Sequence, residues 1–344
     1  MLTEQMLRDY PNLVKALTGI PAEDFWAMME TLEQQYPDYT AHRQTRDQRQ
    51  RAVGGGRPCD LPLVIRVTML LVYLRTHIPQ TLVALLFDGT QSDVSRDLRR
   101  LLPLLREVLP TPERWELDAP SLPDDPVPTD SATTDPTATP STPLPATHVL
   151  VDATEQEVAR PHDPDTRKQY YSGKQKEFTI KTQIVTDADH HIVAISVAVP
   201  GTMHDKKRCD ALDTLDHLAD GTTVELDKGY QGVANQVESR PSNVGLPDPE
   251  SESPQPRLTV RTPHKKPRGG ELTEAQKAEN HAINASRVRV EHCIGWIKNW
   301  TILATQFRCD HAIYSLVMQV VCGLVNQQTK RWQEAKQAEA AYCA

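Results

Sequence analysis

Three carboxylates occupy positions from which acidic side chains could bind divalent cations. Asp152 lies in the sequence VDAT at the end of an apolar, strand-like run, and Asp227 lies in ELDKGYQG directly after a second such run. Glu291 lies in RVRVEHCIGWIK, which has the periodicity of a helix. Mg²⁺ and Mn²⁺ prefer oxygen ligands, and two such ions about 3.5–4 Å apart can activate an attacking oxygen and stabilise a leaving one. The three side chains could therefore serve phosphoryl transfer.

Each of these signals also has a simpler explanation. Aspartates at strand ends often only cap turns, so Asp152 alone and Asp227 alone are weak indications. Arg287 and Glu291 are four residues apart and could form an ordinary surface pair on a helix, worth a few tenths of a kcal/mol. Their combination carries more weight than any one of them.

The expected helix from about Thr273 to Trp300 has two neighbouring stripes. At about 100° per residue, Arg287, Glu291 and Lys298 fall on one polar stripe. The adjoining apolar stripe, which should pack on a sheet, consists of Val290, Ile294 and Ile297. Glu291 thus lies at the margin of the buried face, where it could point at carboxylates on strand ends.

Towards the N-terminus, TLVALLFDGTQSDVSRDLRRLL predicts a helix-turn-helix. Leu82, Leu85 and Leu86 should pack against the second helix, across a turn at Gly89. The outward face of that helix would contact DNA bases at its start and phosphates further along. Its expected DNA-contacting residues are Gln91, Ser92, Ser95, Arg96, Arg99 and Arg100. An ordinary helical hairpin with a basic, solvated face explains the pattern about as well.

Composition divides the 344-residue chain into three parts. Residues 1–108 read as helices, at Ala22–Gln34, Leu61–Leu74, Gln80–Phe87 and Gln91–Leu102. Leu109–Thr147 contains ten of the 27 prolines and contributes −6 to the net charge of −8, so we expect a disordered linker that adds nothing to a core. Residues 148–344 should form the second folded domain, with an insertion around 233–286.

The order of the elements after the linker predicts the fold class. Strand-like runs are followed by a helix, a further strand and long helices, which is typical of a mixed α/β sheet covered by helices. The expected strands are His148–Thr154, Phe178–Thr186, Ile192–Val199, Thr222–Leu226 and Leu258–Thr262. The expected helices are Asp205–Leu218, Thr273–Trp300 and Ala312–Lys336. No apolar run is long enough to span a membrane and no secretory signal is visible, so we expect a cytoplasmic, nucleoid-associated protein.

Several motifs in a fixed order resemble those of bacterial DDE transposases of the insertion-sequence-five type. They are YYSGKQKEFTIKTQIV, PGTMHD, DKGYQG and the arrangement R-x3-E-x6-K formed by Arg287, Glu291 and Lys298. The sequence departs from that family at Asn284, where a tyrosine is frequent, and in the length of its proline-rich segment. Neither departure removes one of the three carboxylates.

The resemblance implies an RNase H-like catalytic domain in which Asp152, Asp227 and Glu291 hold two Mg²⁺ or Mn²⁺ ions. It also implies that Arg287 and Lys298 contact DNA or support Glu291. The expected partners are double-stranded DNA, as terminal inverted repeats and target, and a second copy of the chain. The alternatives are a metal-dependent endonuclease without strand transfer and a transposase-derived DNA-binding regulator.

Two further expectations concern the surroundings of Asp152. Lys174 and Lys176 precede the second strand, so we expect them beside the active site on the DNA backbone, although a solvated loop is nearly as plausible. Asp205, in PGTMHD, competes with Asp227 for the role of second carboxylate. Because Asp precedes a helix there, we predict that Asp205 caps the helix and lies further out than Asp227.

Overall fold

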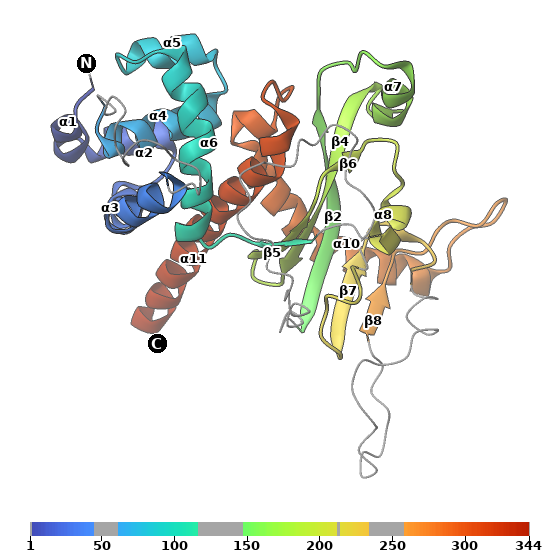
Figure 1. Cartoon of the computed structure of the whole chain (residues 1–344). Coiled ribbons are helices and arrows are strands. Elements are labelled where there is room, and N and C mark those ends of the chain that lie inside the picture. The colour runs from blue at the N-terminus through green and yellow to red at the C-terminus, as the bar shows by residue number, and fades with distance from the viewer. Residues whose placement is uncertain (1, 45–60, 116–146, 212–213, 234–257, 344) are drawn as a thin grey trace. The chain divides into compact units, whose positions relative to one another are not determined.

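The computed structural model describes residues 2–44, 61–115, 147–211, 214–233 and 258–343 (Figure 1). The chain divides into two compact units. The first unit comprises Met1–Thr111, Ile297–Thr305 and Ile313–Ala344, and the second comprises Pro112–Trp296 and Gln306–Ala312. None of the described helices combines the length and the apolar character that a membrane span requires.

The first unit is helical in its described residues. Its helices are α1 (Glu4–Asp9), α2 (Pro11–Thr18), α3 (Ala22–Gln44), α4 (Leu63–Thr76), α5 (Gln80–Leu86), α6 (Gln91–Val108) and α11 (Tyr314–Cys343), with the short 3-10 helix η2 (Thr301–Leu303). A further 3-10 helix, η3 (His311–Ile313), spans the boundary between the units. The four helices predicted before the linker are confirmed, although α3 and α6 extend further. Helices α1 and α2 were not predicted.

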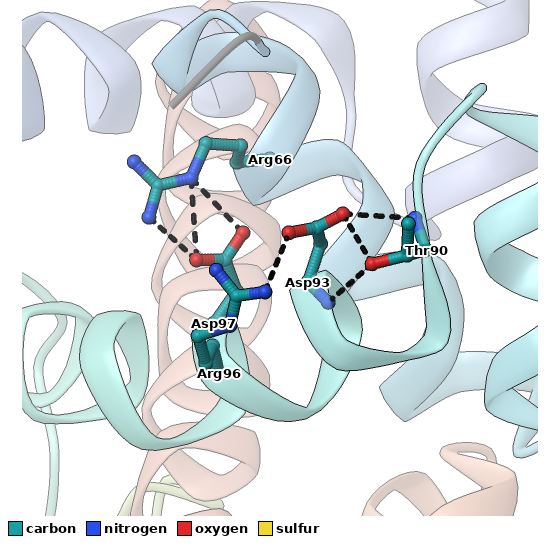
Figure 2. Close-up of polar contacts among 5 residues, drawn as sticks. All are labelled: Arg66, Thr90, Asp93, Arg96 and Asp97. Atoms are coloured by element: carbon teal, nitrogen blue, oxygen red, sulfur yellow. Dashed lines mark hydrogen bonds and ion pairs between the residues drawn. The ribbon is translucent and has the colours of Figure 1, made fainter. Parts of the chain in front are cut away.

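The centre of this unit is α4, in which every side chain from Val64 to Leu74 is buried. One of them is charged. Arg66 donates from Nε to Asp97 of α6 at 3.0 Å and from Nη1 to the hydroxyl of Tyr36 at 2.7 Å. Figure 2 shows Arg66 turned towards Asp97. The buried guanidinium therefore obtains a full counter-charge inside the helical core.

The start of α6 is fixed by a capping box. The hydroxyl of Thr90 accepts from the backbone N–H of Asp93, and the Asp93 carboxylate accepts from the backbone N–H of Thr90 (Figure 2). Two N–H groups that have no partner within the helix are thereby satisfied. This explains why the helix begins at Gln91, as predicted.

The last helix, α11, packs with the helices of the first unit. A Cβ atom at Gly323 would lie 2.9 Å from Leu109 and from Thr111, so glycine allows the segment after α6 to approach closely. Asn326 donates to the carbonyl of Pro110 at 3.0 Å, and Arg331 pairs with Asp24 at 3.1 Å. The second unit therefore does not coincide with the predicted domain at residues 148–344, because α11 belongs to the first unit. The periodicity of a sequence shows that a helix has an apolar face, but not which element covers that face.

The second unit contains one mixed sheet, with the order β1-β5-β4-β2-β7-β8 and with β3 and β6 also paired to β4. Its strands are β1 (Glu113–Trp115), β2 (His148–Glu157), β3 (Tyr171–Ser172), β4 (Glu177–Asp187), β5 (Ile192–Ser196), β6 (Val199–Pro200), β7 (Thr222–Leu226) and β8 (Leu258–Arg261). Its helices are α7 (Pro164–Tyr170), α8 (Asp205–Ala211), α10 (Glu274–Lys298) and the 3-10 helix η1 (Lys228–Tyr230). The predicted α/β class and mixed sheet are confirmed.

The two faces of the sheet have different helical covers. Val151 of β2 and Leu226 of β7 belong to a buried cluster with Cys209 of α8. The long helix α10 lies on the other face, because its Arg287 reaches Asp152, the neighbour of Val151 (Figure 1). The buried residues of α10 recur every three or four positions, at Asn280, Ile283, Arg287, Val290, Cys293 and Ile297.

One prediction about the linker is wrong for its first seven residues. Leu109 is buried, and Glu113–Trp115 forms β1, which pairs in parallel with β5. Trp115 is 1% exposed and stacks on His217 with ring centroids 4.6 Å apart. Because Pro110 and Pro112 precede this short strand, the sequence was interpreted as a linker there. Residues 116–146 of the predicted linker lie outside the described residues.

The predicted insertion around residues 233–286 is only partly described. Residues 234–257 lie outside the described part of the chain. The remainder belongs to the fold itself, since β8 extends the sheet beside β7 and Glu274 already begins α10. Any insertion is therefore shorter than predicted.

Candidate active site

Asp152 and Asp227 lie side by side on the same face of the sheet. Strands β2 and β7 run in parallel, with Val151 opposite Leu226. Both of these apolar residues face the α8 side. Side chains alternate along a strand and the backbone of Asp227 is still extended, so the next residues, Asp152 and Asp227, both face α10. Neighbouring strands are about 4.8 Å apart, which brings the two carboxylates into one site.

Arg287 supplies the positive charge of this site. Its Nη2 lies 2.9 Å from Oδ2 of Asp152, and the arginine side chain is 5% exposed. The other carboxylate oxygen, Oδ1, accepts from the backbone N–H of Ala153 at 2.7 Å. Arg287 therefore does not project into solvent as a free DNA contact in this structure, but neutralises Asp152.

Burial and several neighbouring charges shift the pKa of Asp152. Burial raises the pKa of the Asp152 carboxyl above its ordinary value, and the charges of Asp227 and Asp205 raise it further. The Arg287 guanidinium and the Ala153 N–H oppose this and lower the pKa in part. Asp152 thus lies within the electrostatic influence of two further carboxylates and of one arginine.

Asp205 belongs to the same acidic neighbourhood but approaches it from the other side of the sheet. It is the first residue of α8 and lies 3.5 Å from Nζ of Lys181. Lys181 of β4 is paired with Glu155, and both alternate onto the face that carries Val151. A Cβ atom at Gly229 would lie 2.9 Å from the Asp205 carboxylate, so Asp205 also abuts the loop after Asp227.

The prediction that Asp205 only caps a helix was therefore incomplete. Its carboxylate holds Lys181, and its charge reaches Asp152. Its effect on the pKa of Asp152 ranks after that of Asp227. Its partner Lys181 lies on the sheet face opposite to that of Asp152.

Glu291 is not drawn into this site. It is exposed on α10, one turn beyond Arg287. In the described part of the chain, no three His, Cys, Asp or Glu side chains are grouped to hold a metal ion. The structure thus brings together Asp152 and Asp227 but leaves Glu291 short of them. Buried Cys293, whose thiol pKa is raised to about 12 mainly by burial, is likewise no part of a metal site.

The three predicted lysine contacts are exposed, and Lys174 and Lys176 are distant from Asp152. Lys298 ends α10 and lies about 16 Å along the helix from Arg287. Lys174 and Lys176 lie in the turn between β3 and β4. Because Asp152 is opposite Ile184, eight residues beyond Lys176, the lysines are roughly 25 Å away along the sheet. Lys174 and Lys176 therefore do not flank Asp152, and the prediction that they lie beside the active site is wrong.

The predicted helix-turn-helix corresponds to α5 and α6, but its packing differs from the prediction. Leu82, Leu85 and Leu86 are 45%, 75% and 55% exposed. Val83 and Ala84 of α5 are buried instead. The helix is rotated from the predicted orientation, since an apolar residue at nearly every position leaves the inward face undefined. The leucines therefore form an outer apolar surface.

The polar residues predicted to contact DNA do lie mainly at the surface of α6. Gln91, Ser92, Arg96, Arg99 and Arg100 are exposed and Ser95 is half-buried. Gln91 donates to Gln80 of α5 at 2.6 Å, and Arg96 pairs with Asp93 at 3.3 Å. Asp97, by contrast, points inward to Arg66 (Figure 2). The Asp97 carboxylate therefore adds no negative charge to the exposed surface of α6.

Two charged residues of the second unit were missed. Lys181 and Glu155, opposite each other on neighbouring strands, are 12% and 10% exposed and lie 3.5 Å apart. Lys181 also donates to the carbonyl of Met203 at 3.2 Å, which ties the segment before α8 to the sheet. A lysine inside a strand-like run was the available signal, because a buried lysine requires partners.

Comparisons with known proteins show the family to which the chain belongs. A family model described as DDE superfamily endonuclease matches residues 151–326, about half of the chain. A probable transposase for insertion sequence element IS702 from Microchaete diplosiphon is 28% identical over 180 residues. That alignment covers 52% of this chain and 56% of the relative, so the chain spans about half the length of the curated relative it matches. No solved structure matches significantly. From the extent of the family match, we conclude that the chain belongs to the DDE superfamily endonucleases.

Proposed function

We propose that this chain is a DNA transposase that cuts and joins the ends of an insertion element through an RNase H-like catalytic domain. The observation that carries the proposal is the pair Asp152 and Asp227, which face the same way from neighbouring positions on parallel strands. The name of the similar protein, a probable transposase, supports the choice of reaction. Double-stranded DNA is the proposed substrate, and action as a pair of copies on two DNA ends remains a prediction.

Membership of the DDE superfamily implies dependence on a divalent metal. The residues present fit such an ion, because two carboxylates share one face of the sheet and carboxylate oxygens are ligands that divalent metal ions prefer. Asp152 and Asp227 would hold the metal. We propose Mg²⁺ or Mn²⁺, with a second ion completed by Glu291 once its side chain turns towards the pair.

The residues around the pair have separable tasks in this proposal. Bound metal ions would polarise the phosphate and activate the attacking oxygen. Arg287 sets the charge at Asp152, while Lys181 and Asp205 hold the segment next to the Asp227 loop. At the same sheet edge, Gln231 donates to Pro263 at 2.9 Å beside a hollow of about 360 Å³. Arg261 and Lys265 line this hollow, which suits a DNA phosphate.

Cleavage of the element's own ends tests the proposal. With Mg²⁺, the full chain should nick a duplex that carries a terminal repeat and should join the released end to target DNA. Glu291→Gln removes a charge that metal binding would use, so we expect the rate to fall on the order of 10³-fold with DNA affinity unchanged. Gel assays of nicked and joined products measure both steps.

The same assay separates the alternatives. Glu274→Gln, an equal charge change at the start of α10 and away from the hollow, should leave cleavage unchanged. Nicks without joined products would indicate an endonuclease, and binding without nicks would indicate a regulator. A Glu291→Gln variant as active as the original chain would remove Glu291 from the site.

DNA recognition by α6 has its own test. Arg100→Gln should weaken binding to all duplexes and lower the slope of log affinity against log salt by about one, because one phosphate contact is lost. Lys15→Gln, on α2 of the same unit, is a matched charge change outside the predicted surface. Fluorescence anisotropy over a salt series gives the slopes. Equal slopes for Arg100→Gln and the original chain would make α5 and α6 an ordinary packed hairpin.

A further inference from the structure

The strongest unexplained feature is the burial of Arg287 against a carboxylate that should bind metal. Its guanidinium lies 2.9 Å from Oδ2 of Asp152, and its side chain is 5% exposed against 22% for Asp152. Its Nη1 is buried and has no hydrogen-bond partner among the described residues. The arginine is thus committed to Asp152 with part of its donor capacity unused.

The pairing has a clear electrostatic reason. An arginine stays charged at any ordinary pH, and a buried charge without a partner is strongly unfavourable. Asp152 is half-buried, with Asp227 directly after the adjacent strand. Before any metal is present, each of Arg287 and Asp152 therefore needs the other.

A metal ion on Asp152 changes this balance. Both oxygens of Asp152 already accept hydrogen bonds, Oδ2 from Arg287 and Oδ1 from the N–H of Ala153. A divalent ion would have to take Oδ2 from the guanidinium or lie beside it. Like charges repel strongly where water is largely excluded, so the ion and the arginine should compete.

We propose that Arg287 is a placeholder cation for the metal site. It neutralises Asp152 before metal binds, competes with the metal for Oδ2, and leaves Asp152 when the metal binds. This inference rests on the proposed function, because it requires Asp152 to be a metal ligand. The released guanidinium then needs another anion, and a phosphate of the DNA substrate supplies one.

A purely positioning role for Arg287 predicts the opposite change in metal affinity. If the arginine only orients Asp152 for the metal, its loss should weaken metal binding, as loss of a supporting partner usually does. If it competes, its loss should tighten metal binding. The sign of one measurement therefore separates the two roles.

The test is Mn²⁺ binding to the full chain without DNA, measured by electron paramagnetic resonance of free Mn²⁺. Arg287→Gln should bind Mn²⁺ about tenfold more tightly than the original chain, because a repelling charge has been removed. Its metal-free form should unfold at a lower temperature, because Asp152 has lost its counter-charge. Unchanged or weaker Mn²⁺ binding would overturn the placeholder role.

Asp152→Asn separates failure of the inference from failure of the proposed function. Loss of Mn²⁺ binding in this variant, together with unchanged binding in Arg287→Gln, would reject only the placeholder role. Equal binding by Asp152→Asn and the original chain would remove Asp152 as a ligand and overturn both.

A measurement on the original chain decides the matter if Arg287→Gln does not fold. Phenylglyoxal modifies accessible guanidinium groups, and peptide mass spectrometry locates the modified arginines. Arg287 should be protected in the metal-free chain and should react several-fold faster with Mg²⁺ present. Arg160, which lies over the ring of Phe178, provides an internal reference away from the metal. Equal protection of Arg287 with and without Mg²⁺ would overturn the proposal.

Discussion

Asp227→Asn is expected to abolish metal-dependent cleavage while DNA binding persists. The substitution keeps the shape of the side chain but removes the negative charge that lies beside Asp152 on one face of the sheet. A metal held by the pair would lose a ligand, and the cleavage rate should fall on the order of 10³-fold or more. Single-turnover cleavage and anisotropy with the same duplex measure the two properties.

Asp205→Asn is the matched control for this substitution. It makes the same change in the same acidic neighbourhood, but on the side that faces Lys181. Loss of that ion pair should cost about 1–3 kcal/mol of unfolding free energy, with cleavage retained at temperatures where the variant is folded. If instead Asp205→Asn abolishes cleavage and Asp227→Asn does not, the two aspartates must exchange roles.

The largest effect on stability is expected at Asp97. Asp97→Ala leaves Arg66 as a buried charge beside the hydroxyl of Tyr36, with its carboxylate partner gone. Removal of one partner from a buried ion pair typically costs about 3–5 kcal/mol. Urea unfolding of the variant, followed by circular dichroism, should show this loss as a lower midpoint.

Two further variants identify the cause of that loss. Asp93→Ala, one turn earlier on α6, removes a capping box and an exposed pair with Arg96, and should cost about 1 kcal/mol. Arg66→Met combined with Asp97→Leu removes both charges and should recover much of the stability. A double variant as unstable as Asp97→Ala would show that the charge left behind is not the reason.

Much of the fold was predictable because periodicity reports burial directly. Thr222–Leu226 was predicted as a strand with the bounds that β7 has. The apolar run before Arg75 predicted α4, since a helix surrounded by others is apolar on every side. Where the periodicity is unclear, the prediction was wrong. In α5 nearly every position is apolar, so the sequence does not show which face points inward. Strand β1 has only three residues between prolines, which are too few to show an alternation.

The candidate site was predictable to the extent that it depends on strand ends. Asp152 and Asp227 follow apolar runs, and strands in parallel place such residues together. The partners of these aspartates were harder to predict from the sequence. Arg287 pairs across 135 residues of sequence, and Lys181 meets Asp205 only because β4 and α8 pack together. Glu291 depends on how far a side chain turns, which no sequence pattern specifies.

The sheet ends in short strands at both edges, in the part of the chain that the structure describes. Strand β1 has three residues and follows Pro112, and β8 has four and is soon followed by Pro263. Open edges are templates on which other chains can add strands, and brief edges beside prolines offer few free N–H and C=O groups for this. The short edges thereby protect the folded chain against aggregation through its sheet.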